Sequence, residues 1–202
     1  MQREEKSERS RRQVLDVALQ LFSRHGYRAT SVRDIARRAG LSTGSLYHHF
    51  PDKEAIFNAL LDELWQIADS RRFPFRRALL AGNFPDNLEQ LGFAARDSIV
   101  EFRQYVTLIY VDMLEFDGTH IRKFYGEMAR HFAEVLAENG MLEKMQRQLR
   151  PGVPAVSAVM LTMRVFFSYF TIEILFNVPE PFGKNSTEVV KDIADVLRNG
   201  MI

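Results

Sequence analysis

Apolar residues recur every three to four positions along most of this chain, which is the spacing that predicts helices. The first such stripe follows Ser10-Arg11-Arg12-Gln13, a capping-box pattern that predicts a helix start at Ser10. Gly26 predicts the end of this helix, because glycine accepts the left-handed conformation that closes many helices. The stripe consists of Val14, Val17, Ala18, Leu21 and Phe22.

Two shorter helices are predicted next. Ser31 begins a second capping-box pattern, and Gly40 predicts the end of the helix that it starts. Ser42 can cap a third helix from Thr43 to about Phe50, in which Leu46 and Phe50 face inward together. A short helix, a tight glycine-containing turn and a second short helix, packed on a longer helix, form the helix-turn-helix arrangement.

The outward face of the third predicted helix carries chemistry that suits duplex DNA. Gly44 lets a phosphate or a base edge approach the backbone, and hydroxyls near a helix N-terminus lie where phosphate binds. Tyr47 offers a phenolic donor, and His48 offers a ring donor or a stacking surface. The alternative is a helical hairpin in which these are ordinary surface residues. The predicted contacts are Thr43, Gly44, Ser45, Tyr47, His48 and Lys53.

Two stretches, Thr30-Ser31-Val32-Arg33-Asp34-Ile35-Ala36 and Ala39 to Glu54, closely resemble the N-terminal domain of TetR-type (TetR/AcrR) transcriptional regulators. The resemblance covers about residues 8–60. Many family members carry lysine where Thr43 stands, so the operator sequence cannot be inherited from the family. The resemblance implies DNA contacts by Ser31, Ser42, Thr43, Gly44, Ser45, Tyr47, His48 and Lys53, and we add Arg33 to this set.

The rest of the chain predicts helices only, so the expected fold class is all-α. We expect a helix-turn-helix head over residues 1–53 and a helical ligand-binding and dimerisation domain over residues 54–202. A fourth helix is predicted from Asp52 to about Ser70, followed by a loop over Arg71–Arg77 that contains Pro74. Further helices are predicted over 86–116 (interrupted at 103–104), 119–138, 141–149, 153–176 and from a cap at Ser186.

The stretch from Val153 to Phe176 is apolar on more than one face, and such a helix must be buried. It is either the centre of the body or the surface that meets a second subunit. The family resemblance implies that the last two helices form a homodimer interface, and two heads on successive half-sites raise affinity and specificity together. The predicted interface is Val156, Met160, Met163, Phe167, Phe170, Ile174, Val189, Ile193, Val196 and Leu197.

The body is also expected to hold a small molecule, an expectation that comes from the family resemblance and from the many aromatic and methionine residues. For any single residue, the ordinary interpretation is a packed core. Arg164 and Glu173 lie nine residues apart on an apolar helix, so each needs a partner from another helix, another chain or a ligand. The predicted ligand-binding residues are Phe102, Tyr105, Ile109, Tyr110, Met113, Phe124, Met128, His131, Arg164 and Phe167.

Charge and composition narrow the class of function. The net charge is +1, but residues 1–53 carry 11 Lys and Arg against 6 Asp and Glu, a net +5, and the remainder carries −4. A basic head favours an anionic partner such as double-stranded DNA. The absence of cysteine excludes disulfides and thiolate sites and fits a reducing cytoplasm. Arg164 within the most apolar stretch favours a buried soluble helix, so no membrane contact is expected.

No motif points to catalysis. The five histidines lack metal-binding spacing, and the chain lacks the glycine loops that bind phosphates and the elbow motif that presents a nucleophilic serine. We therefore predict no enzyme activity, no metal and no cofactor. The expected protein is a cytoplasmic repressor that binds a palindromic operator as a homodimer and is released by a small, largely apolar effector. The alternative is an all-helical carrier or interaction protein that does not bind DNA.

Overall fold

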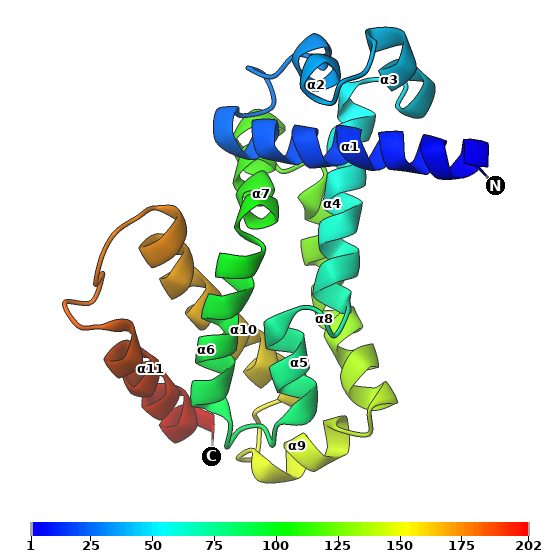
Figure 1. Ribbon diagram of the computed structural model, residues 1–202. Coiled ribbons are helices and arrows are strands. Elements are labelled where there is room, and N and C mark those ends of the chain that lie inside the picture. Colours follow the sequence, from blue (N-terminus) through cyan, green and yellow to red (C-terminus); the bar gives the residue numbers. More distant parts are fainter. Residues whose placement is uncertain (1, 202) are drawn as a thin grey trace. The chain divides into compact units, whose positions relative to one another are not determined.

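The computed structural model describes the backbone of residues 2–201 and the side chains of residues 4–200, and the regular elements in that range are all helices (Figure 1). The predicted all-α fold class is confirmed. The chain forms two compact units. The head unit comprises the residues up to Gln66 together with Gln104–Lys123, and the body unit comprises Ile67–Arg103 and the residues from Phe124 onward.

The head unit is built on a long first helix. It contains α1 (Gln2–His25), α2 (Val32–Arg38), α3 (Thr43–His49), most of α4 (Lys53–Asp69) and most of α7 (Arg103–Glu115). Helix α1 crosses α4, and α2 and α3 lie on one side of it (Figure 1). The prediction that Ser10 caps the first helix is wrong, because α1 already begins at Gln2. The preceding Glu, Lys and Arg residues are strong helix formers, and Glu8 pairs with Arg11 one turn later.

The core of the head unit joins residues that are far apart in the sequence. Phe22 of α1, Ile35 of α2 and Leu46 of α3 are fully buried in one cluster with Phe57 of α4. Leu108 of α7 belongs to the same cluster. Burying one side chain of this kind stabilises a fold by about 1.5–3 kcal/mol. Helix α7 is therefore part of the structure that supports the helix-turn-helix, although it comes much later in the chain.

The body unit is centred on α6, against which α5, α10 and α11 all pack (Figure 1). The break between α6 and α7 falls at Phe102, close to the interruption that the sequence predicts at residues 103–104. Helix α10 continues directly into a short π-helix, η1. The elements are α5 (Pro74–Ala81), α6 (Leu88–Glu101), most of α8 (Ile121–Glu138), α9 (Leu142–Gln148), α10 (Ala155–Phe170), η1 (Thr171–Leu175) and α11 (Ser186–Met201).

Helix α5 begins inside the stretch predicted as a loop. Pro74 lies in its first turn, where a missing N–H leaves no hydrogen bond unmade. The next amide, of Phe75, donates to the buried Ser98 Oγ at 3.0 Å, and that hydroxyl donates to Ala94 O at 2.7 Å. The loop prediction is therefore wrong from Pro74 onward. Because an amide in the first turn of α5 binds a side chain of another helix, no local sequence pattern indicates where α5 begins.

Asn185, and not the predicted Ser186, caps α11. Asn185 Oδ1 accepts a hydrogen bond from the Glu188 amide at 3.1 Å, and Asn185 Nδ2 donates to the Glu188 carboxylate at 2.6 Å. The Ser186 hydroxyl instead donates to Glu173 Oε1 at 2.6 Å. Glu173 thus has the partner from another helix that its place in an apolar stretch requires.

Residues Ala155–Leu175 are long and apolar enough to cross a membrane by length and composition alone. In the body unit, however, one face of this stretch is buried against protein, with Ala158, Phe166 and Phe170 fully enclosed. Arg164 is exposed halfway along the same helix. Burial of one face with a charge on another is the behaviour of a helix that packs in a protein core.

Helix α6 lies close to α10 and α11 at Gly92. A β-carbon there would lie 2.7 Å from Phe166 Cε1 and 2.8 Å from Val190 Cγ1. We expect Gly92→Ala to lower the free energy of unfolding by about 1–3 kcal/mol, because overpacking forces these helices apart. Gly126 in α8 has open space at the same position, so Gly126→Ala is expected to raise it by about 0.5–1 kcal/mol. Denaturant unfolding followed by circular dichroism measures both, and equal effects would contradict the described packing.

Candidate nucleic-acid interface

Local hydrogen bonds define both helices of the helix-turn-helix. Ser31 Oγ accepts from the Asp34 amide at 3.1 Å and donates to Asp34 Oδ2 at 2.6 Å, which lowers the pKa of that carboxyl from its ordinary value. Gly40 has a φ of +68°, and the chain turns there without side-chain strain. Ser42 Oγ accepts from the Ser45 amide at 3.1 Å. The two predicted N-caps, Ser31 and Ser42, are therefore confirmed.

The two faces of α3 separate apolar from polar side chains. Leu46 is fully buried and Phe50 is 3% exposed, so the predicted inward pair is confirmed. Tyr47 is 49% exposed, and Gly44 and His48 are also exposed. The side chain of Tyr47 points away from the core that holds Leu46. The face predicted to contact DNA is therefore the face that the protein leaves to solvent.

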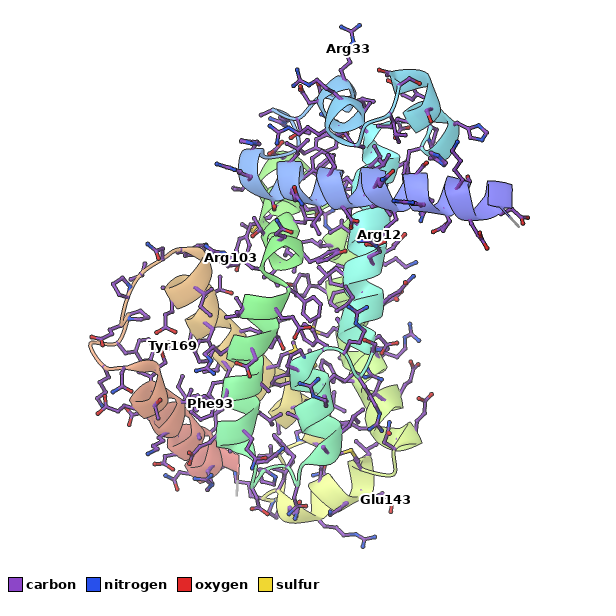
Figure 2. The ribbon with its side chains drawn as sticks, viewed as in Figure 1. Arg12, Arg33, Phe93, Arg103, Glu143 and Tyr169 are labelled. Atoms are coloured by element: carbon purple, nitrogen blue, oxygen red, sulfur yellow. The ribbon has the colours of Figure 1, made fainter. Side chains whose placement is uncertain are left out.

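Helix α2, which packs against α3, carries exposed cations. The Arg33 side chain extends outward from α2 (Figure 2), and Arg38 on the same helix is also exposed. Arg37 pairs with Asp34 at 2.7 Å, so part of its charge is compensated. Thr43 and Ser45 are half-buried at the start of α3. The surface combines hydroxyl groups, guanidinium groups and an accessible backbone at Gly44. Such groups can form hydrogen bonds with phosphate oxygens and with base edges.

Lys53 has a different role from the one expected. Its Nζ donates to Tyr27 O at 2.8 Å and to Thr30 O at 2.9 Å, and it lies 4.0 Å from the centre of the Tyr27 ring. Burial lowers the pKa of Lys53 from its ordinary value, because the ammonium leaves water. We correct the prediction accordingly: the ammonium is engaged inside the head unit and binds the turn between α1 and α2.

Sequence reasoning missed the residues that stabilise the head through hydrogen bonds between distant helices. Glu115 at the end of α7 accepts from the backbone amides of Tyr27 at 3.0 Å and Arg28 at 2.6 Å. Arg12 of α1 is bonded to Glu63 of α4 at 2.8 Å. These pairs are separated by 51 to 88 positions, so no local motif signals them.

The residues predicted to bind a ligand are divided between the two units. Four lie in the head unit, on α7: Tyr105, Ile109, Tyr110 and Met113. Tyr105 donates to Glu63 at 2.7 Å, and burial raises its pKa from the ordinary value. Met113 is 51% exposed. Tyr105 is thus a bracing residue of the head, and the side chain of Met113 does not line an enclosed space.

The other six lie in the body unit: Phe102, Phe124, Met128, His131, Arg164 and Phe167. Phe102 and Phe167 belong to one aromatic cluster, because both rings pack against Phe73. Arg164 lies over the Tyr125 ring of α8 at 5.7 Å, and His131 Nε2 lies 2.7 Å from Asp69. A pocket of ≈ 250 Å³ in the same unit has a different lining: Leu80, Gly82, Asn83, Phe84, Asn139, Gly140, Met141, Lys144 and Met145.

The predicted dimer residues differ in exposure. Phe170, Val189 and Ile193 are buried within one protomer, so they have no surface to offer a partner and we remove them from the predicted interface. Val196 is 73% exposed. Leu161 and Val165, which the sequence prediction omitted, are also exposed on α10. The remaining predicted residues are half-buried: Val156, Met160, Met163, Phe167, Ile174 and Leu197.

Among the residues that the structure describes, no group of three or more His, Asp or Glu side chains is placed to hold a metal ion.

Comparison with known proteins finds a family match within the head unit. Residues 14–60 match the model described as "Bacterial regulatory proteins, tetR family". The chain is 39% identical over 66 residues to the transcriptional regulator AcrR of Shigella flexneri, covering 33% of this chain and 29% of AcrR. It is 42% identical over 89 residues to the repressor KstR2 of Mycobacterium tuberculosis, covering 40% of this chain and 44% of KstR2.

The likeness in fold extends further than the likeness in sequence. The structure of NalD, the secondary repressor of the MexAB-OprM multidrug efflux pump in Pseudomonas aeruginosa, aligns over 97% of this chain and 98% of its own, with a TM-score of 0.64 and 20% identity. At that identity the match concerns the fold alone. In sequence, the chain spans about a quarter to a half of the length of the curated relatives it matches.

The orientation of α3 predicts a large effect on stability at one residue and almost none at its neighbour. We expect Leu46→Ala to lower the free energy of unfolding by about 2–5 kcal/mol, because it leaves a cavity in the head core. Tyr47→Ala is expected to change it by no more than about 0.5 kcal/mol, as at most exposed sites. Urea unfolding of both variants measures the difference. A large loss in Tyr47→Ala would show that this side chain packs inward.

Proposed function

We propose that this chain is a member of the TetR family of bacterial regulatory proteins, that it represses transcription by binding an operator in duplex DNA as a homodimer, and that it is released by a small, largely apolar effector. The observation that carries the proposal is the face of α3. A capped helix of seven residues keeps Leu46 and Phe50 in the core and leaves Gly44, Tyr47 and His48 in solvent. Such a face enters the major groove in helix-turn-helix proteins.

The corrected role of Lys53 changes which groups contact DNA. We propose that phosphate contacts come from Arg33, Arg38 and the Tyr47 hydroxyl, and that Thr43, Gly44 and His48 face the base edges. The hydroxyls of Ser31 and Ser42 serve as helix caps, so they support DNA binding by shaping α2 and α3.

The effector is proposed to act through continuous helices. Helices α4, α7 and α8 each have residues in both the head unit and the body unit. A ligand among the aromatic side chains around Phe102 and Phe167 would displace these helices, and α4 would carry the change to the head. Two heads whose spacing no longer equals that of the half-sites cannot both bind.

The DNA contacts are tested with a duplex selected by the wild-type protein from a randomised library. We expect Arg33→Ala to weaken binding to all duplexes, on the order of tenfold, because one charged contact is lost. The slope of log affinity against log salt should fall by about 0.9 for each phosphate contact removed. Fluorescence anisotropy at several salt concentrations measures both quantities.

Arg147→Ala is the matched control, because Arg147 is an exposed arginine of α9 in the body unit. It should leave affinity and salt slope unchanged. Failure of the library to enrich any sequence would contradict the proposed function and favour a carrier or interaction protein. An unchanged salt slope in Arg33→Ala would remove this residue from the interface.

The dimer is tested at the exposed apolar residues of α10. We expect Leu161→Glu to convert a dimer into a monomer at micromolar concentration, because an interface would bury an unpaired carboxylate. Val100→Glu, at an equally exposed position of α6, should leave the dimer intact. Sedimentation velocity distinguishes the two states. A wild-type monomer, or a dimer in both variants, would contradict the proposed interface.

A further inference from the structure

The turn between α1 and α2 is held by two ionic side chains that come from other helices. It begins at Gly26, whose φ is +84°, and ends at Thr30, whose hydroxyl donates back to Gly26 O at 2.8 Å. Helix α2 starts two residues later, directly after the Ser31 cap. The conformation of this turn therefore decides where α2 begins relative to α1, and α3 follows α2 after a short turn.

Glu115 accepts hydrogen bonds from two amides of the turn. Its two carboxylate oxygens accept separately from the Tyr27 and Arg28 amides, at 3.0 and 2.6 Å, and its carbonyl accepts from the Arg28 guanidinium at 3.0 Å. A β-carbon at Gly26 would collide with Glu115 Oε1, so the carboxylate lies directly against the glycine. A carboxylate that accepts two amides is a charge-assisted arrangement, and it fixes two successive peptide units in space.

Lys53 donates hydrogen bonds to two carbonyls of the same turn. Its ammonium binds the carbonyls of Tyr27 and Thr30, and the Tyr27 ring lies beneath it. Within five residues, the turn thus has two amides bound by an anion from α7 and two carbonyls bound by a cation from α4. Glu115 is not among the groups proposed to contact DNA, because both of its carboxylate oxygens are bound to backbone amides of the turn.

We propose that Glu115 is a positioning residue for DNA recognition, which sets the orientation of α2 and α3 by fixing the Tyr27 and Arg28 amides. This inference rests on the proposed function. Glutamine in its place would keep one acceptor oxygen but turn an NH₂ group toward the second amide, where two donors oppose each other. The turn would then lose one hydrogen bond and shift, while the surface that attracts DNA would keep all its cations.

The test compares two duplexes of equal length, one selected by the wild-type protein from a randomised library and one a scrambled version of it. We expect Glu115→Gln to weaken binding to the selected duplex about tenfold, the order expected for loss of one charge-assisted hydrogen bond. Its affinity for the scrambled duplex and its salt slope should stay as in the wild type, because no phosphate contact is removed. The ratio of the two affinities therefore falls about tenfold.

This ratio separates positioning from mere stability. A variant that only reduces the folded fraction lowers both affinities in proportion, so its ratio stays constant. Glu134→Gln, which changes an exposed ion pair with Arg130 on α8, is the matched control and should keep the wild-type ratio. An unchanged ratio in Glu115→Gln would overturn the proposal. If the wild-type protein selects no duplex, the proposed function itself fails, which is a different outcome.

A measurement on the wild-type protein covers the case in which Glu115→Gln does not fold. We expect the Tyr27 and Arg28 amides to exchange with deuterium much more slowly than amides of an open turn, because each donates to the carboxylate. Exchange at the rate of an open turn would overturn the proposal. Glu115→Asp, which keeps the charge on a shorter side chain, should restore part of the affinity ratio that Glu115→Gln loses.

Discussion

The DNA recognition proposed for this protein depends on burial of one face of a helix that is too short to be stable alone. Helix α3 has seven residues, whereas isolated helices shorter than about 12–15 residues are marginal in water. Leu46 and Phe50 place half of it in a core formed by α1, α2, α4 and α7. The Ser42 cap satisfies an amide that the first turn leaves unpaired. Because the buried face cannot turn outward without exposing this core, the polar face cannot turn inward.

The same core explains why α7 belongs with the head. Phe116, just after α7, packs against Tyr27 with ring centres 4.5 Å apart and against Phe57 with ring centres 5.1 Å apart. His120 then reaches back, with Nδ1 2.5 Å from the fully buried Asp112 and Nε2 3.3 Å from Glu54 of α4. Apolar contacts pack α7 into the core of the head unit. Polar contacts then fix its end against the turn between α1 and α2 and against α4.

What could be predicted from the sequence was local. The Ser31 and Ser42 caps, the glycine turns and the inward pair Leu46 and Phe50 each follow from residues within one or two helical turns. The two domains were expected to meet at residue 53, but contacts group α4 to Gln66 and Gln104–Lys123 with the head. Nothing near residue 115 signals that its carboxylate binds amides 87 and 88 positions earlier.

Partners from distant segments also explain the individual errors. The start of α5 is satisfied by Ser98 of another helix, so a proline that looked like a helix breaker stands at a helix start. Lys53 lies at the start of α4, where a phosphate contact was the natural expectation, yet its ammonium is bound by two carbonyls of the head. In each case the prediction failed because the residue's surroundings are determined by packing against a distant segment, which the local sequence does not indicate.

If α3 binds DNA as proposed, its small size makes a second copy of the head a physical requirement for specific binding. Each well-placed contact to a base contributes about 1–3 kcal/mol of discrimination, and one helix of seven residues presents only a few outward side chains. Genomes offer about 10⁶–10⁹ competing sites, which a single half-site cannot outweigh. In the proposed homodimer, the exposed Leu161 and Val165 on α10 would have a reason to remain apolar, because a fixed pair of heads needs a surface that joins two bodies. Rigid positioning of α3 within each head and a fixed distance between the heads serve the same end, since an error in either one prevents both helices from entering their grooves together.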